Sequence, residues 1–364
     1  MIMANRLDRG FYKYQDEFEQ KALEVLRSGW YVLGKEVEAF EEEFAGYIGS
    51  KYCAGLASGL DALYLAFRAI GVKEGDEVIV QANTYIASVM GITMNGAIPV
   101  FVEPDEYHGL DASKLEAAIT EKTKAVLVVH LYGQSCRMDE IAGICKEKGL
   151  KLIEDCAQSH GSHFKGRTTG TFGDIGCFSF YPSKNLGAFG DGGAIVTDRE
   201  DYCKRIKMLR NYGSEKRYYN KEVGVNSRLD EIQAGLLRVR LKHMNELTKE
   251  KQDIAARYLK ELKNPSIELP KVREDADHIW HQFVIKSSRR DELIEYLKER
   301  EIGTIIHYPV PPHLQEAYKY LGFKKGDFPI AEKLADEVLS IPMFNGMTGE
   351  EQTRVIEALN RWEG

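Results

Sequence analysis

The sequence predicts an α/β fold with a mixed, mainly parallel sheet of about seven strands, followed by a smaller α+β domain. Three observations support this prediction. Short apolar runs recur through the first two thirds of the chain, with helical patterns between several of them. Two of the later apolar runs follow each other without a helix between them. From about Asn245 this alternation of apolar runs and helices gives way to a long charged helix and a mixture of other elements. A chain of 364 residues is also long for one compact core and suits two domains.

The apolar runs of the first two thirds are short and bounded by polar or glycine-rich turns. We expect strands at Tyr52–Gly55, Glu77–Val80, Pro99–Val102, Ala125–Val129, Lys151–Glu154, Gly176–Phe180 and Gly193–Thr197. Helical patterns fall between several of them, at Leu60–Ile70, Ile86–Asn95, Lys114–Ile119 and Met138–Lys148. Apolar strands that alternate with helices are typical of a parallel sheet covered on both faces. The last two strands have no helix between them, which predicts a mixed sheet rather than an all-parallel one.

The remainder of the chain predicts the smaller domain. A long charged helix at Leu247–Leu262 leads through two prolines to a strand at Ile279–Ile285, a helix at Arg290–Arg300 and a strand at Thr304–His307. The last helix begins at Thr348, and Glu351 three residues later forms a capping-box pattern. We assign residues 14–246 to the large domain, and residues 1–13 and 247–364 to the small one.

The composition narrows the class of protein. Hydrophobic residues make up 43% and charged residues 29%, an ordinary balance for a soluble protein. No apolar run has the length of a membrane span, and the amino terminus lacks the apolar core of a signal peptide, so we expect a cytoplasmic protein without a membrane partner. A net charge of −7 argues against a nucleic-acid partner. The six cysteines contain no C-x-x-C pair, which favours reduced thiols over disulfides and leads us to expect no metal site.

Three segments place polar groups where a predicted strand ends, which is where open α/β sheets bind ligands. LIEDCAQSHG carries Asp155 and Gln158, and AGLASGLDALYLAF brings Ser58 and Asp61 to the start of a helix. CFSFYPSKNLGAFGDGGA carries Lys184 between an apolar strand and a glycine-rich turn. Each segment alone has an ordinary interpretation, respectively a turn-capping Asp, a common helix cap and a surface lysine.

Together the three segments provide a set of groups that pyridoxal 5'-phosphate (PLP) requires. Lys184 would supply an amine whose pKa is lowered by the loss of water around it. Asp155 would supply a carboxylate for the positively charged ring nitrogen. The helix that starts at Ser58–Asp61 would hold the phosphate dianion at its amino terminus.

The chain also contains a series of motifs in one order: SGLDAL, ANTYIAS, VVHLYGQ, EDCAQSHG, SFYPSKNLGAFGDGGA, RNYG, NSRLDEIQA and HYPVPPHLQ. From about Tyr31 to the carboxyl end, these motifs resemble the DegT/DnrJ/EryC1/StrS family of sugar aminotransferases. The resemblance implies the fold type I of PLP-dependent aminotransferases. It also implies a homodimer in which the two active sites are shared across the interface.

By this resemblance, Lys184 would be the Schiff-base lysine and Asp155 the partner of the pyridinium nitrogen. Gln158 would lie at the ring hydroxyl, and Tyr85 would stack on the ring. The residues that would bind the phosphate are Gly59, Leu60 and Ser179, with Asn226 reaching in from the neighbouring subunit. Many family members have Thr at the position of Leu60, so here a backbone N–H would replace that hydroxyl.

Candidates for sugar contacts are placed by position and by the same resemblance. Tyr181 lies three residues before Lys184 and is expected to face the same cavity. The other candidates are His307, Tyr308, His160 and Arg228. All but His160 have an alternative interpretation: a buried aromatic residue for Tyr181, an interdomain contact for the His-Tyr pair, and a dimer contact for Arg228. His163 and the basic aromatic stretch at 216–219 are interpreted as surface features.

The predicted reaction moves an amino group from L-glutamate through PLP to a nucleotide-linked keto sugar. The GLDAL and ANTYIAS segments resemble the subgroup that aminates C3 of a dTDP-3-keto-6-deoxyhexose and gives a dTDP-3-amino-3,6-dideoxyhexose. Amination at C4 of a 4-keto sugar and a non-catalytic PLP-binding regulator are the alternatives. Related dehydratases have His where this chain has Lys184, and LASGLDAL lacks the G-x-G-x-x-G of a nucleotide-binding oxidoreductase. Residue types leave the galacto or gluco configuration open.

Overall fold

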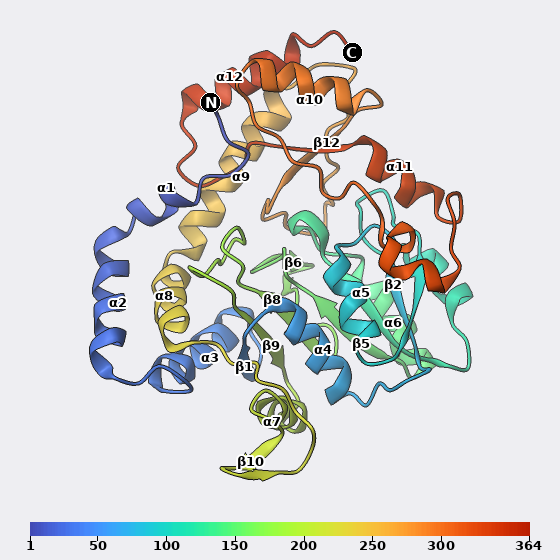
Figure 1. The fold of residues 1–364 in the computed structure, drawn as a ribbon. Helices are drawn as coiled ribbons and strands as arrows, with labels where there is room; N and C mark the ends of the chain where they lie inside the picture. Colours follow the sequence, from blue (N-terminus) through green and yellow to red (C-terminus); the bar gives the residue numbers. More distant parts are fainter.

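The computed structural model describes all 364 residues, and a seven-stranded sheet lies at its centre (Figure 1). Its strands are β1 Tyr52–Leu56, β2 Glu77–Gln81, β3 Ile98–Val102, β4 Thr123–Val129, β5 Lys151–Asp155, β8 Ile175–Ser179 and β9 Gly193–Thr197. Their order is β1-β9-β8-β5-β4-β2-β3, and β9 is the one strand that runs antiparallel to its neighbours. The predicted mixed, mainly parallel sheet is therefore confirmed.

Alternate residues of the central strands pack into different cores, as the two-residue period of a strand requires. In β4, Leu127 and Val129 pack with α4, α5 and α7 on one face, whereas Val126 and Val128 pack with α6 on the other. A further core on this second face joins α3 and α8 to the β1, β8 and β9 end of the sheet. Because both faces are covered, the strands are largely apolar, which is the feature that predicted them.

The helices surround the sheet and extend beyond it (Figure 1). Around the sheet they are α3 Lys35–Ile48, α4 Gly59–Ala69, α5 Ile86–Thr93, α6 Met138–Lys148, α7 Glu200–Leu209 and α8 Glu231–Lys242, whereas α1 Leu7–Tyr12 and α2 Gln15–Ser28 lie farther out, with α2 packed on α8. Those of the carboxyl-terminal part are α9 Met244–Glu261, α10 Arg290–Glu299, α11 Pro329–Glu337 and α12 Gly349–Asn360. The capping box of Thr348 and Glu351 is present at the start of α12, as predicted.

Three predicted elements differ from the structure, and one of them, the strand expected at Ile279–Ile285, begins only at Phe283. The helix expected at Lys114–Ile119 is replaced by two short 3₁₀ helices, Ala112–Lys114 and Glu116–Ala118. The strand expected at Thr304–His307 is reduced to one bridge between Ile305 and Ser340. The partner of β12 (Phe283–Lys286) is instead β13 (Val338–Ile341), and Pro309 soon removes a backbone N–H that a longer strand would need.

The carboxyl-terminal part has its own core and also packs on the sheet. One cluster joins Ile2 to buried residues between Ile254 and Trp362, and the two chain ends lie on this side of the molecule (Figure 1). Tyr318 and Ala331 pack instead with the sheet-side core. Glu103, just after β3, accepts hydrogen bonds from the backbone N–H groups of Ile330 and Ala331 at the start of α11. The domain boundaries given above stay a prediction.

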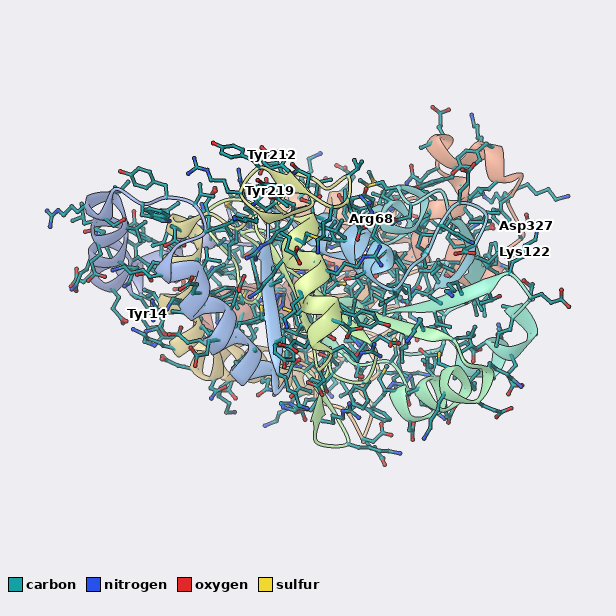
Figure 2. The ribbon with its side chains drawn as sticks, turned by 90° about the horizontal axis from the view of Figure 1, so that it is seen from below. Tyr14, Arg68, Lys122, Tyr212, Tyr219 and Asp327 are labelled. Carbon is teal, nitrogen blue, oxygen red and sulfur yellow. The ribbon has the colours of Figure 1, made fainter.

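A hairpin projects beyond α7 at the lower end of the molecule (Figure 1). Its strands are β10 Ser214–Lys216 and β11 Tyr219–Asn220, and the remaining short strands β6 His163–Phe164 and β7 Arg167–Thr168 form a second hairpin elsewhere. Seen from below, Tyr212 and Tyr219 lie next to each other on the outer surface (Figure 2). Tyr218 is 82% exposed.

None of the helices combines the length and the apolar character that crossing a membrane requires.

Candidate active site

One cavity of about 440 Å³ opens where several strands of the sheet end. Its wall contains the carboxyl ends of β4, β5 and β8 and the first turns of α4 and α5, which is the expected ligand position in an open α/β sheet. The predicted site residues on this wall are Gly59, Leu60, Tyr85, Asp155, Gln158, Ser179, Tyr181, Lys184, His307 and Tyr308. The fold thus brings together residues that lie up to 249 positions apart in the chain.

Lys184 follows β8 on a loop that two backbone hydrogen bonds fix. Its own N–H donates to Tyr181 O at 2.8 Å, and the N–H of Ala188 donates to Phe180 O at 2.7 Å. The loss of water around the amine lowers the pKa of Lys184 to about 8, and the carboxylate of Asp155 opposes this shift. A larger share of this lysine is therefore free amine near neutral pH than of an ordinary surface lysine.

The lowered pKa predicts how Lys184 reacts in the PLP-free protein. Its acylation rate should follow a midpoint near pH 8, so at pH 7.5 about a quarter of Lys184 is free amine, against about 0.1% of a lysine with a pKa of 10.5. Because the pKa is lower in the folded protein than in the unfolded chain, burial of this amine opposes folding below pH 8, and the opposition disappears above pH 10.5. Peptide mass spectrometry after brief acylation measures the midpoint, and a midpoint near 10.5 would contradict the prediction.

Asp155 ends β5 and is 5% exposed. Its carboxylate accepts a hydrogen bond from Ser88 Oγ at 2.8 Å and another from the backbone N–H of Ala157 at 3.1 Å. Burial raises the pKa of Asp155, while Ser88, Ala157 and Lys184 act in the opposite direction. A buried carboxylate of this kind is stabilised by a positively charged partner. Ser88 lies in the ANTYIAS segment, but its contact with Asp155 was not predicted from the sequence.

The amino terminus of α4 forms a tightly packed cradle. Ser58 caps the helix through its Oγ, which accepts a hydrogen bond from the N–H of Asp61 at 3.1 Å. A Cβ at Gly59 would lie 2.5 Å from the Cβ of Ser179, so only glycine fits between this helix end and β8. Asp61 in turn accepts a hydrogen bond from Ser227 Oγ at 2.7 Å. The helix end therefore presents free backbone N–H groups beside a serine hydroxyl, which suits a phosphate.

Gly59→Ala is expected to weaken PLP binding about tenfold or more, because a methyl group forced into a well-packed site costs about 1–3 kcal/mol. The added Cβ must displace Ser179 or the first turn of α4, which are both parts of the cradle. An absorbance titration of the PLP-free protein measures the dissociation constant.

The matched control is Gly46→Ala inside α3, where nothing lies within 4 Å of the new Cβ. It should leave PLP affinity unchanged and stabilise the fold by about 0.5–1 kcal/mol. Equal PLP affinity in Gly59→Ala and the wild type would show that the close approach of α4 to β8 has no part in binding.

Tyr308 closes the cavity from the carboxyl-terminal part of the chain. Its hydroxyl accepts a hydrogen bond from Gln158 Nε2 at 3.0 Å, and its ring centre lies 5.0 Å from that of Tyr85. The Oε1 of Gln158 accepts from the N–H of Tyr132 at 2.6 Å. Because Nε2 has two hydrogens, one remains for a ligand. Tyr181, 55% exposed, stands at the mouth of the cavity.

His307 lies on the wall with both ring nitrogens in use. Nδ1 is 2.8 Å from Ser340 Oγ, and Nε2 is 2.9 Å from Gln282 Nε2. The amide of Gln282 can only donate through that nitrogen, so Nε2 accepts and Nδ1 carries the hydrogen. Burial lowers the pKa of His307 to about 4, with a smaller contribution from Lys184. The predicted contact with sugar stays a prediction, and in this arrangement the ring has no free nitrogen for it.

Three candidates lie away from the cavity wall of this chain. His160 is fully buried behind β8, where Nε2 is 2.9 Å from Ser179 O and the ring lies near Phe178 and Phe180. The expectation that it faces the sugar is corrected here, because the alternation of β8 turns those two rings, and His160 with them, to the side opposite the cavity. Asn226 is exposed, and Arg228 donates to Asn211 Oδ1 at 3.0 Å.

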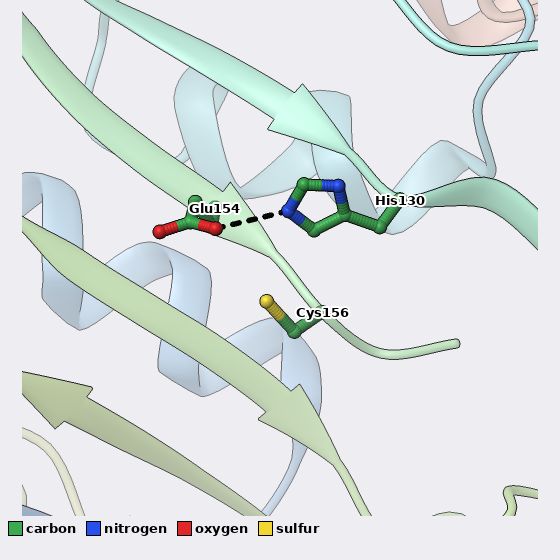
Figure 3. Close-up of side chains that lie close together, drawn as sticks. All are labelled: His130, Glu154 and Cys156. Atoms are coloured by element: carbon green, nitrogen blue, oxygen red, sulfur yellow. Dashed lines mark hydrogen bonds and ion pairs between the residues drawn. The ribbon is translucent and has the colours of Figure 1, made fainter. Parts of the chain in front are cut away.

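A buried cluster of His130, Glu154 and Cys156 lies beside the site (Figure 3). Its ligand-type atoms lie within 4.8 Å of one another, but hydrogen bonds already occupy the imidazole and the carboxylate. His130 Nδ1 accepts from the N–H of Cys136 at 3.1 Å, and Nε2 is 3.0 Å from Glu154. Glu154 also accepts 2.7 Å bonds from two backbone N–H groups, those of Gly170 and Gly173. The cluster therefore joins β4 and β5 to the loop before β8 and helps to fix the strand that carries Asp155.

The amine, the carboxylate and the cradle together define the class of the protein. A lysine with a lowered pKa faces a buried carboxylate across one cavity, and a glycine-dependent helix end beside a serine provides the anion site. These three groups fit PLP in the amine, ring-nitrogen and phosphate positions. The fold and the site are thus those of a PLP-dependent enzyme built on an α/β sheet.

Comparison with known proteins agrees with this class. The DegT/DnrJ/EryC1/StrS aminotransferase family model matches residues 13–360, so the chain belongs to this family. It is 51% identical over 351 residues to the dTDP-3-amino-3,6-dideoxy-alpha-D-galactopyranose transaminase of Aneurinibacillus thermoaerophilus, with 96% of each protein covered. It is 45% identical over 358 residues to the dTDP-3-amino-3,4,6-trideoxy-alpha-D-glucose transaminase of Streptomyces venezuelae, with 98% of this chain and 94% of that protein covered.

A solved structure is similar over the whole fold. The crystal structure of S. venezuelae DesV in complex with a ketimine intermediate matches with a TM-score of 0.97 and 44% sequence identity. The match covers 99% of this chain and 98% of that one. The sheet order and the second core described above are therefore those of an aminotransferase of this family.

Proposed function

We propose that the protein is a PLP-dependent aminotransferase that moves an amino group from L-glutamate to the keto carbon of a nucleotide-linked sugar. The observation that carries the proposal is the joint position of Lys184 and Asp155 in one cavity, with the cradle of α4 beside them. When bound, PLP supplies an aldehyde that exchanges amino groups and a ring that accepts electrons. The ketimine intermediate bound to DesV in its crystal structure supports the same chemistry.

The position of each residue in the cavity indicates its role in the proposed reaction. Asp155, fixed by Ser88, would stabilise a positive charge on the ring nitrogen. The amine of Lys184 would take a proton from the substrate carbon and return it, and its lowered pKa in the PLP-free protein suits both transfers near neutral pH. Tyr85 and Tyr308, whose ring centres lie 5.0 Å apart, would flank the ring. The phosphate would be held by the N–H groups of Gly59 and Leu60 and by the hydroxyl of Ser179.

We infer that the sugar is a dTDP-3-keto-6-deoxyhexose and that C3 receives the amine. Two relatives whose names state amination at C3 of dTDP sugars support this choice, at 51% and 45% identity. The test incubates the purified protein with PLP, L-glutamate and either dTDP-3-keto- or dTDP-4-keto-6-deoxyhexose, with the amino position assigned by NMR. Amination at C4 alone would favour the 4-keto alternative, and no glutamate-dependent amination of either would favour a non-catalytic regulator.

We further propose a homodimer that shares its active sites. Asn226 and most of the hairpin at 214–220 are exposed and do not line the cavity of their own chain, which suits a contact with a neighbouring subunit. Sedimentation should then give twice the protomer mass of 41.2 kDa.

All six cysteines are free and buried, which fits a reducing compartment, so we propose that the protein is cytoplasmic.

A further inference from the structure

His281 lines the same cavity as Lys184 and takes no part in the contacts of Lys184, Asp155 or the α4 cradle. It immediately precedes the segment that leads into β12, and it is 6% exposed. Its Nδ1 lies 3.2 Å from the side-chain oxygen of Asn185, the residue next to Lys184. His281 is therefore a titratable group held beside the reactive amine by a contact of its own.

The amide of Asn185 fixes which nitrogen of His281 carries the hydrogen. Nδ2 of Asn185 donates to the backbone oxygen of Ile279 at 3.0 Å, so its Oδ1 must face the other way. There it meets Nζ of Lys251 at 3.3 Å as well as His281. An amide oxygen only accepts, so Nδ1 of His281 must donate. The hydrogen of the neutral ring is therefore on Nδ1, and Nε2 keeps a lone pair.

The surroundings keep the imidazole neutral. Burial lowers the pKa of His281 well below its usual value, and the positive charges of Lys184 and Lys251 lower it further. Lys251 comes from α9 and forms no ion pair, and its charge is offset only in part, by the more distant carboxylate of Glu250. The pKa of Lys251 itself is lowered to about 8 by burial and by Arg240.

The Nε2 of His281 has no partner within the protein. No backbone or side-chain group donates to it, and it is not among the polar atoms that are both buried and unpaired, so it is accessible from the cavity. A lone pair in this position requires a hydrogen-bond donor. Phosphate and carboxylate groups of the reactants have little or no hydrogen to donate at neutral pH, and the ammonium group of glutamate would add a further cation beside Lys251. The neutral donors of the sugar nucleotide remain, and among them the hexose hydroxyls lie next to the keto carbon on which Lys184 would act.

We propose that Nε2 of His281 accepts a hydrogen bond from a hydroxyl group of the bound sugar, with Asn185 and Lys251 as positioning residues that fix the ring. The inference rests on the proposed function, because it assigns a contact to the sugar of that reaction. The inference predicts that the two half-reactions depend differently on His281. The half-reaction with the sugar requires it, whereas the half-reaction with glutamate does not. Discrimination by a fixed acceptor is effective because a substrate without the hydroxyl leaves that acceptor unpaired.

Two substitutions of His281 distinguish the contribution of Nδ1 from that of Nε2. In His281→Asn the side-chain nitrogen takes the place of Nδ1 and keeps the contact with Asn185, but no atom replaces Nε2. In His281→Gln the side-chain oxygen reaches the place of Nε2 and restores an acceptor. We expect His281→Asn to lower kcat/KM for the sugar nucleotide about tenfold or more, mainly through KM, since a net hydrogen bond is worth about that factor. His281→Gln should recover a large part of the loss.

Single-turnover absorbance of bound PLP measures each half-reaction separately. The glutamate half-reaction of both variants should stay within about twofold of the wild type, because the proposed bond has only a hydroxyl partner. Equal losses in both half-reactions, or an unimpaired sugar half-reaction in His281→Asn, would overturn the inference. Absence of glutamate-dependent amination in the wild type would instead overturn the proposed function.

NMR of the PLP-loaded protein with ¹⁵N-labelled histidine gives a readout that is independent of turnover and of variant folding. The resonance missing in His281→Asn, or shifted by Asn185→Asp if that variant does not fold, identifies the ring. At neutral pH its Nε2 should have the shift of an unprotonated nitrogen, and the amino sugar nucleotide product should move it whereas dTDP should not. A protonated Nε2, or a resonance that the product leaves in place, would refute the assignment.

Discussion

Lys184→Ala should abolish covalent attachment of PLP and lower the rate of transamination by about 10⁴-fold, the upper range for loss of a positioned acid–base group. The expected loss is large because one amine has two tasks, binding the aldehyde and moving the proton. The cradle at α4 and the carboxylate of Asp155 remain, so PLP should still bind without a covalent link. Borohydride reduction followed by mass spectrometry measures attachment, and glutamate-dependent turnover measures the rate.

Lys251→Met is a matched control, because Lys251 is a second lysine whose pKa is lowered to about 8 by burial. It lies beside Asn185, so it tests whether lowered basicity alone leads to attachment. This variant should keep one PLP bound covalently for each chain after reduction. If Lys184→Ala were still labelled and Lys251→Met were not, the reactive amine would be Lys251, and the assignment of Lys184 would be wrong.

The sheet could be predicted from the sequence because its signal is local. Each strand from β1 to β9 of the central sheet is a short, largely apolar run because both of its faces are buried, as Ala125–Val129 illustrates. The antiparallel β9 could be inferred as well, because no helix separates it from β8. The Thr348 capping box was likewise recognised because both of its residues lie within one turn.

The contacts that complete the site could not be predicted in the same way, because they join distant segments. Ser88 and Asp155 are 67 residues apart, and Asn185 and His281 are 96 apart. No period or spacing in the chain marks Ser88, Asn185 or His281 as neighbours of the reactive lysine. His160 illustrates the opposite error, since its position next to a site motif suggested a cavity contact that the alternation of β8 prevents.

The two central charges influence each other across the cavity. The carboxylate of Asp155 raises the pKa of Lys184 against the effect of lost water, and the ammonium of Lys184 lowers the pKa of Asp155 against the effect of burial. Each group therefore keeps the other closer to its charged form in the PLP-free protein. With PLP attached, Lys184 would no longer have a free ammonium group, and the protonated ring nitrogen would provide the positive charge that stabilises the carboxylate of Asp155.

Asp155→Asn should lower the rate of transamination by about 10²–10⁴-fold while PLP stays bound, since the amide has the same shape but cannot hold a positive charge on the ring nitrogen. Ser88→Ala is the graded comparison. It removes one hydrogen bond to the carboxylate, and a loss of about tenfold is expected. Stopped-flow absorbance with saturating L-glutamate measures both variants.

Asp155→Asn should also change the pKa of Lys184 in the PLP-free protein, and this effect can be measured without catalytic turnover. Because the carboxylate raises the pKa of Lys184, its removal should lower the acylation midpoint of Lys184 below pH 8. Asp191→Asn is the control, since Asp191 also lines the cavity but does not contribute to the pKa of Lys184. A midpoint that is the same in Asp155→Asn and Asp191→Asn would show that the two central charges are not coupled. The lost rate in Asp155→Asn would then have to arise from altered placement of the ring rather than from its charge.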